Sequence, residues 1–114
     1  MGRRVKTFAE FQIIGHVGKV KRVGPTLRVD LAADYGRKDE GSGEYKSNPY
    51  WNEVTLFGDR LVAWAEAGVR KGDLVHVRGT VRQTSYEKDG QTIYGVTLAA
   101  NDFDLLAPKA RVEA

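Results

Sequence analysis

The segment from Asp73 to Tyr86 alternates apolar and polar residues, and this alternation restricts what the chain can fold into. Read with a period of two, Val75, Val77 and Val81 occupy one side. The other side is polar and cationic and ends in an aromatic ring, with His76, Arg78, Thr80, Arg82, Thr84 and Tyr86. Successive side chains of a β-strand point to opposite faces. The segment therefore predicts a long strand with one face in a core and the other in solvent.

A second segment, Tyr50–Gly58, has the same period. Val54 and Leu56 fall on one side, and the opposite side carries Trp51, Glu53, Thr55 and Phe57. Two large rings thus share a face with a carboxylate and a hydroxyl. Because the solvent face of a strand normally holds ordinary polar residues, this face predicts a binding surface rather than a bare exterior.

Turn signals divide the rest of the chain into short elements, and thirteen glycines with many β-branched residues favour strands. One helix is predicted at Asp59–Ala67, with Gly68 as its C-terminal cap. Residues 34–49 are rich in glycine, serine and charge and are too long for a tight hairpin, so they predict a protruding arm. Gly15 and Gly18 are expected to bend the first strand. The predicted strands cover residues 8–20, 27–33, 50–58, 73–86 and 91–100, with a further short pairing at 103–106.

The order of these elements is three strands, one helix and two strands. This is the order of the OB fold, an all-β, five-stranded Greek-key barrel. Here the helix separates strands three and four, and the long arm separates strands two and three. A chain of 114 residues fits one such domain. We expect the domain at residues 1–107 and a short flexible tail at 108–114.

Several classes of function are excluded by what the sequence lacks. The absence of cysteine removes disulfides, thiolate nucleophiles and the usual zinc sites. His16 and His76 stand apart from any ligand-like spacing, and the acidic residues show no paired arrangement for acid–base work. We therefore expect neither enzymatic activity nor a metal or other cofactor. No apolar run is long enough for a signal peptide or a membrane span, so a cytoplasmic protein without membrane contact is expected.

The distribution of charge says more than the net charge of +3. Residues 1–28 hold seven basic groups against one acidic group, residues 29–69 hold four against eight, and residues 70–91 hold five against three. Positive charge is thus concentrated in two strand-rich segments. If these segments adjoin in a small sheet, they make one electropositive groove.

Rings interleaved with guanidinium groups suit a ligand with exposed π-faces and a polyanionic backbone, which describes unpaired nucleic acid. Trp51, Phe57 and Tyr86 are the candidates for stacking on bases. For the phosphates, the strand-borne candidates are Arg28, Arg78 and Arg82, and the flanking candidates are Arg3, Arg4, Lys6, Lys19, Lys21 and Arg22. For each of these cations, a solvated surface charge is the alternative.

Other aromatic residues are better explained by packing. Trp64 lies on the apolar side of the predicted helix, so we expect it in the core. Phe11 and Phe103 are also expected to be structural, and the role of Tyr94 is left open.

Several motifs in series resemble the bacterial single-stranded DNA-binding proteins across roughly residues 8–106. They are Leu31-Ala32, Trp51 with Val54 and Phe57-Gly58, Lys71-Gly72, the valine row through Gly79 to Arg82, Tyr86, Asp89-Gly90-Gln91 and Tyr94. Each motif alone is weak, since glycine turns and alternating valines occur in any small barrel. Their order and spacing together are specific.

The resemblance implies base stacking by aromatic side chains on an outer face. Trp51 and Phe57 match family aromatics, and Tyr86 stands where a tryptophan is commoner. Tyr35, near the start of the arm, is the nearest candidate for a fourth. Family members usually form homotetramers, so a homo-oligomer is implied, with a tetramer favoured over a dimer. The chain ends without the acidic tip through which the family recruits partners, so recruitment through the tail is not expected. It also has Asn52 where the family often has a histidine that contributes to subunit contacts.

Together these features predict a protein that binds and protects single-stranded DNA without sequence preference during replication, recombination or repair. The alternative is an OB-fold protein-interaction module of a primosome-like assembly, whose aromatic face would dock a protein. An RNA-directed role is a third possibility.

Overall fold

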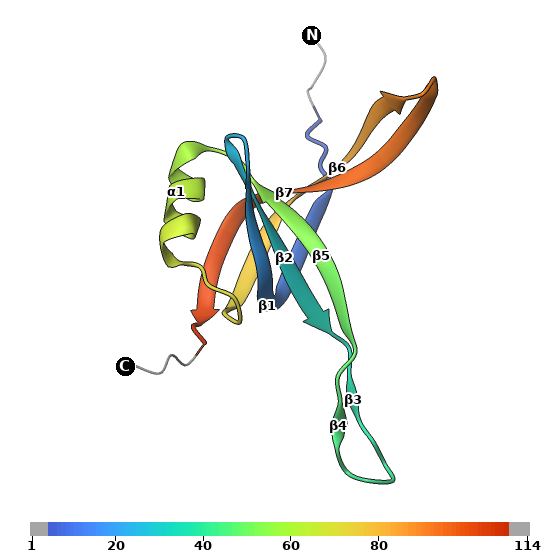
Figure 1. The fold of residues 1–114 in the computed structure, drawn as a ribbon, viewed down its shortest axis with the longest axis vertical. Helices are drawn as coiled ribbons and strands as arrows, with labels where there is room; N and C mark the ends of the chain where they lie inside the picture. Colours follow the sequence, from blue (N-terminus) through green and yellow to red (C-terminus); the bar gives the residue numbers. More distant parts are fainter. Residues whose placement is uncertain (1–4, 110–114) are drawn as a thin grey trace.

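Five strands close into a barrel in the computed structural model, which describes residues 5–109. They are β1 (Glu10–Val23), β2 (Thr26–Asp34), β5 (Pro49–Leu56), β6 (Leu74–Lys88) and β7 (Gln91–Ala107). Their order around the barrel is β1-β2-β5-β7-β6, and pairing of β1 with β6 closes it (Figure 1). All neighbours are antiparallel except β5 and β7. The predicted all-β OB fold is confirmed.

The core follows from the alternation read in the sequence. Six side chains on three strands are completely buried, namely Val29, Leu31, Val54, Leu56, Val75 and Val77. Phe103 is almost fully buried and Phe11 packs against the core, as expected. Val81 is only partly buried because β6 leaves the barrel near this point.

A close approach of two backbones at Gly79 lets β6 bend around the barrel. A Cβ atom at this position would overlap the carbonyl group of Ala99 on β7. The register between β6 and β7 shifts at the same point, between Arg78 and Gly79. Only glycine leaves room for this contact. The predicted bend in β1 is also present, as a register shift between Val17 and Val20.

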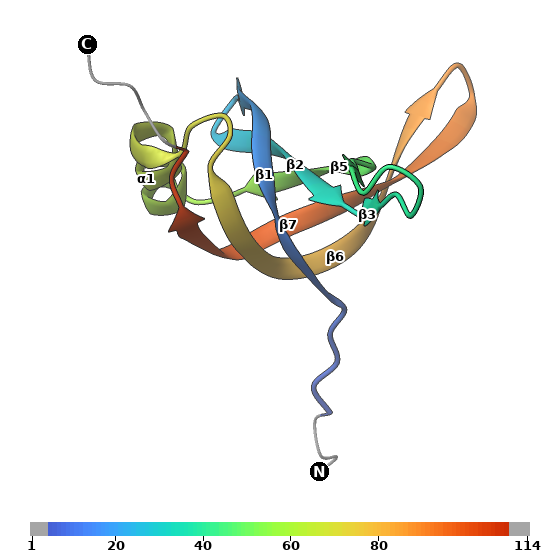
Figure 2. The same cartoon turned by 90° about the horizontal axis from the view of Figure 1, so that it is seen from below.

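Strand β7 is longer than predicted. It runs without a break through the expected short pairing at 103–106 and ends at Ala107. Beyond the barrel, β6 and β7 continue as a two-stranded hairpin that projects away from it (Figures 1 and 2). Its turn is Asp89–Gly90, where both residues have positive φ angles.

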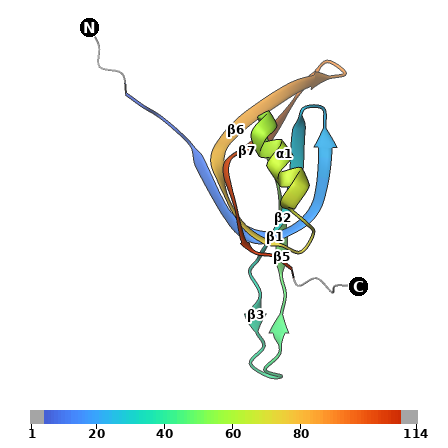
Figure 3. The same cartoon turned by 90° about the vertical axis from the view of Figure 1, so that its left-hand side faces the viewer.

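The helix α1 (Asp59–Gly68) lies across one end of the barrel (Figure 3). It buries Val62 and Ala65 against the core. The predicted cap is wrong by one residue, since Gly68 is the last helical residue and the chain turns extended at Val69. None of the helices in residues 5–109 has the length and hydropathy needed to cross a membrane.

The prediction that Trp64 lies in the core is wrong. Its side chain is 44% exposed, and its ring packs edge-on against Phe103 with the centroids 5.9 Å apart. The helix covers the barrel end with its valine and alanine face, which leaves the larger indole at the margin of the core. Trp64 therefore seals the edge of the core instead of filling it.

The arm is more ordered than its composition suggests. It contains a small two-stranded sheet of β3 (Arg37–Lys38) and β4 (Tyr45–Lys46), which extends away from the barrel (Figure 1). Asp34 closes its base. The backbone N–H of Asn48 and the hydroxyl of Ser47 donate to this carboxylate at 2.9 and 2.7 Å, and together they lower the pKa of Asp34 to about 2.

The predicted tail begins with an anchored residue. The backbone N–H of Lys109 donates to the buried carboxylate of Asp73 at 2.9 Å. Residues 110–114 of the predicted tail lie outside the described residues.

Replacing Trp64 with alanine should lower the free energy of unfolding by about 2 kcal/mol, less than the 3–5 kcal/mol typical of a fully buried tryptophan. Urea denaturation followed by circular dichroism measures this change. An unchanged midpoint would show that the contact with Phe103 adds nothing to stability.

Titrating the arm with acid should show Asp34 protonating near pH 2. Because the folded pKa lies below the ordinary value of 3.8, the carboxylate contributes its full stabilisation above that value and loses it as the pH falls toward 2. The amide proton shifts of Gly36 and Asn48, both bonded to this carboxylate, report the event by NMR. Asp34→Asn should remove this titration. A midpoint near 3.8 in the unmodified protein would contradict the hydrogen-bonded base of the arm.

Candidate nucleic-acid interface

A groove of about 660 Å³ runs across the outer face of the barrel. Its walls come from β2, β5, β6 and β7, and it brings together three predicted ring positions that are distant in sequence. Trp51, Phe57 and Tyr86 are 60%, 47% and 60% exposed. The three rings predicted to share an outer surface are thus exposed and line one groove.

The ring positions follow from strand geometry. Trp51 and Phe57 are six residues apart along β5 and its exit, so both project from the outer face, about 20 Å apart. Tyr86 reaches the groove from the projecting hairpin, two residues beyond Thr84 on the same face of β6. Tyr94, whose role was open, is exposed on the hairpin but does not line the groove.

Gly18 provides the seat for Trp51. A Cβ atom at Gly18 would overlap the six-membered ring of the indole, so the ring lies against the backbone of β1. From the sequence, Gly18 was expected only to help bend the first strand. A signal for the second role was absent, because the two residues are 33 positions apart.

The floor of the groove carries one ion pair. Arg28 Nη1 lies 3.6 Å from Glu53 Oε1, and both side chains are about half exposed. Within the described part of the chain, these are the only charged residues that line the groove, and their formal charges cancel. The predicted electropositive groove is therefore wrong for the floor.

Three cations that form no ion pair within residues 5–109, Lys19, Lys21 and Arg82, lie near the groove without lining it. Lys21 pairs in register with Arg28 and so shares its face. Lys19 borders an adjoining hollow of about 590 Å³ with Trp51, Lys71 and the acidic Asp30. On the opposite rim, Arg82 precedes Thr84 on the same face of β6, and its Nε donates to Thr80 Oγ1 at 3.2 Å. Lys71 was not among the predicted phosphate contacts, because it follows the helix in a turn, where no periodicity assigns a face.

Arg78 does not lie in the groove, which corrects its placement beside Arg82. Its guanidinium is 3.7 Å from both Glu10 on β1 and Asp102 on β7. The pairing of β1 with β6 stops at Thr80, so Arg78 belongs to the barrel wall while Arg82 belongs to the base of the hairpin. Period-two alternation places Arg78 and Arg82 on the same side of β6, but the bend in the strand gives them different surroundings.

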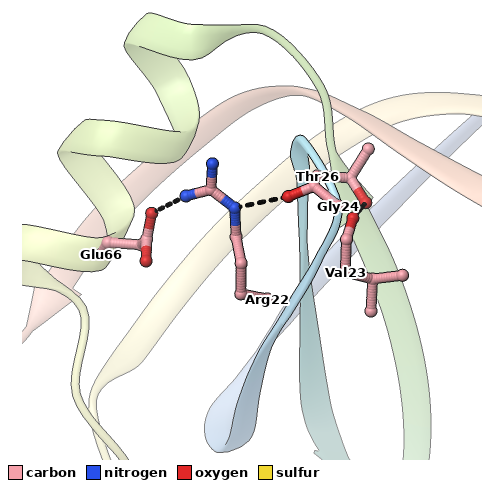
Figure 4. Close-up of polar contacts among 5 residues, drawn as sticks. All are labelled: Arg22, Val23, Gly24, Thr26 and Glu66. Carbon is pink, nitrogen blue, oxygen red and sulfur yellow. Dashed lines mark hydrogen bonds and ion pairs between the residues drawn. The ribbon is translucent and has the colours of Figure 1, made fainter.

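Arg22 does not line the groove either. It forms an ion pair with Glu66 of α1, and its Nε donates to the carbonyl of Gly24 at 2.7 Å (Figure 4). Thr26 Oγ1 donates to the Val23 carbonyl in the same turn. Arg22 therefore joins the β1–β2 turn to the helix.

Tyr35 lies at the base of the arm, outside the groove. Its ring packs edge-on against Tyr50 at 5.6 Å between centroids, beside a separate hollow of about 530 Å³ that Arg37 and Lys46 also line. Lys6 is exposed in the segment before β1, and the predicted contacts of Arg3 and Arg4 lie outside the described residues.

The histidines and carboxylates show no metal-binding arrangement in residues 5–109. His76 is hydrogen-bonded to Gln12 Oε1 at 2.7 Å and lies 3.6 Å from Asp104 Oδ2. It therefore belongs to the polar outer surface of β1, β6 and β7.

Comparison with solved structures places this barrel among single-stranded DNA-binding proteins in fold. A Plasmodium falciparum SSB, solved in complex with ssDNA, superposes with a TM-score of 0.67 at 20% identity and covers 91% of this chain and 99% of its own. The mitochondrial protein Rim1 of S. cerevisiae gives 0.67 at 22% identity, covering 90% and 99%. The small single-stranded DNA-binding protein from Streptomyces coelicolor gives 0.62 at 18%, covering 88% and 95%.

At the level of sequence, residues 8–106 match the single-strand binding protein family. This match spans the barrel, the arm, the helix and the groove with its three rings. The chain therefore belongs to the single-strand binding protein family, whose members are non-catalytic proteins that bind single-stranded DNA.

Proposed function

We propose that this protein coats single-stranded DNA by stacking bases on Trp51, Phe57 and Tyr86, and so protects it and prevents re-pairing. The observation that carries the proposal is the convergence of these exposed rings, from two separate parts of the chain, on one groove. Every base has a π-face, so such a surface accepts any sequence. Duplex DNA should bind much more weakly, since its bases hide their faces in the stack.

The energies of stacking are adequate for this function. Each base stacked on an aromatic side chain contributes about 1–3 kcal/mol by alanine substitution. Three such contacts along one groove support useful affinity before any phosphate is bound.

Phosphate contacts supply the second part of the affinity. Lys19, Lys21 and Arg82 lie at the rims, where a backbone would pass when its bases face the floor. Neutralising phosphates releases counterions, so binding should weaken as salt rises.

The arm extends the proposed path. Tyr35 offers an exposed ring, and Arg37 and Lys46 line the same hollow. Tyr35 and Tyr50 form a second pair of exposed rings at the base of the arm, which a longer DNA chain would also contact.

We further propose that the protein works as a homo-oligomer, a tetramer or a dimer. It would act in replication, recombination or repair in the cytoplasm. Sedimentation of the free protein measures the oligomer. A compartment such as the mitochondrion, where Rim1 is found, is the alternative location.

Replacing Trp51 with alanine should weaken binding of oligothymidylate about 5- to 150-fold, the equivalent of one lost stacking contact. Fluorescence anisotropy of a labelled oligomer measures the affinity without relying on tryptophan emission. Thermal stability should change little, since the indole is largely exposed. Trp64→Ala is the matched control and should lower stability while keeping affinity. If the two variants behaved alike, the assignment of faces would be wrong.

Replacing Arg82 with glutamine should reduce the salt dependence of binding by about one unit in the slope of log K against log salt. Arg78→Gln changes the same charge on the same strand but at a guanidinium held between Glu10 and Asp102. Its slope should stay that of the unmodified protein. Equal reductions in both variants would show that the two arginines contact DNA alike.

A further inference from the structure

The projecting hairpin of β6 and β7 has one unpaired edge. Residues 82–88 of β6 pair with β7 on one side. The other edge continues the one that pairs with β1, and that pairing ends at Glu10 and Thr80. Within residues 5–109, no strand covers this edge beyond that point. A free edge presents a row of unpaired N–H and C=O groups, to which a further strand can add.

The segment that precedes β1 starts at the root of this free edge. Residues 5–9 have no regular secondary structure, and they leave the barrel beside the hairpin in a different direction (Figures 1 and 3). One ladder bond is already present, because the N–H of Val81 donates to the carbonyl of Ala9 at 2.9 Å. This bond continues the register of β1 and β6 by one pair. The segment is therefore held at the point from which pairing along the hairpin would propagate.

The register determines which side chains such pairing would bring to the groove. Continued toward the N-terminus, it pairs Phe8 with Arg82 and Lys6 with Thr84. Residues directly opposite each other on antiparallel strands share a face. Thr84 and Tyr86 line the groove from that face of β6. Phe8 and Lys6 would therefore extend the groove surface by one strand, about 4.8 Å beyond β6.

The alternate residues of the segment would cover the opposite face of the hairpin. Continuing the same register places Val5 beside Ser85, whose partner on β7 is Tyr94. Tyr94, Val96 and Val5 are all largely exposed in the structure. Pairing would bury part of this apolar surface, so the third strand gains contacts on both of its faces.

We propose that residues 5–9 pair with the free edge of β6 when single-stranded DNA binds, and that Phe8 then stacks on a base while Lys6 contacts a phosphate. This inference rests on the function proposed above. In the free protein, the conformational entropy lost in ordering the segment opposes the pairing. DNA favours the paired state, because only there do the ring and the ammonium group lie on the groove side, and a ligand shifts an equilibrium through its differential affinity.

Hydrogen exchange at the Gln83 amide measures the pairing directly. The N–H groups of a strand point alternately to its two edges, so that of Gln83 points to the same edge as that of Val81. Adding oligothymidylate should slow its exchange, followed by NMR, by about tenfold or more. Thr7→Pro should abolish this protection, since Thr7 falls opposite Gln83 and proline has no N–H for the ladder. Thr7→Val is the matched control and should keep the protection, because valine favours strands.

Anisotropy with labelled oligothymidylate measures the contribution of the segment to affinity. Phe8→Ala should weaken binding by about fivefold or more, the lower end for one stacked base. Thr7→Pro should weaken it similarly, because the ring is then no longer held on the groove side. Thr7→Val should leave the affinity unchanged.

Three outcomes would overturn the proposal. Protection of Gln83 by DNA in Thr7→Pro would mean that the DNA itself covers the edge. Protection already present in the free protein, as a second copy on this edge would give, would mean that DNA does not drive the pairing. An unchanged affinity in Phe8→Ala would remove the stacking contact. Failure of the unmodified protein to bind oligothymidylate would instead reject the proposed function, whereas binding without protection of Gln83 would reject only the pairing.

Discussion

The backbone contact between β6 and β7 at Gly79 controls the arrangement of everything around it. A side chain here would displace the Ala99 carbonyl, so glycine allows the sharp bend and the register shift that accompany it. Before this point β6 is a wall of the barrel, paired on both edges. After Thr80 it loses β1 and continues with β7 as a hairpin. Tyr86 reaches the groove only because the hairpin leaves the barrel here.

Alternation in the sequence predicted the fold and the faces well. The buried valines and leucines of β2, β5 and β6 and the exposed Trp51, Phe57 and Tyr86 all follow from a period of two, because that period is set by the backbone itself. Alternation could not predict which cations share a surface. Arg78 and Arg82 occupy one side of one strand and yet have different surroundings, since the strand bends between them.

Long-range contacts account for the remaining differences. Arg22 meets Glu66 across 44 residues, and Arg28 meets Glu53 diagonally between two neighbouring strands. Local patterns contain no information about such partners, so free cations and paired cations look alike in the sequence. The resulting charge distribution differs from the expected one: the groove floor is balanced and the surplus lies at its edges. In the proposed function, this distribution would separate base stacking in the centre of the groove from counterion release at its edges.

The seat that Gly18 provides for the Trp51 indole has a consequence for kinetics as well as for affinity. The indole lies against the backbone of β1, and we expect this contact to restrict its rotation, so that less rotamer freedom is lost if a nucleobase stacks on it. Most of the entropy cost of fixing the Trp51 side chain would then arise in folding and not in each binding event with DNA. In the proposed function, Trp51 would thus be a preorganised platform, and stacking a base on it would need little rearrangement of its side chain.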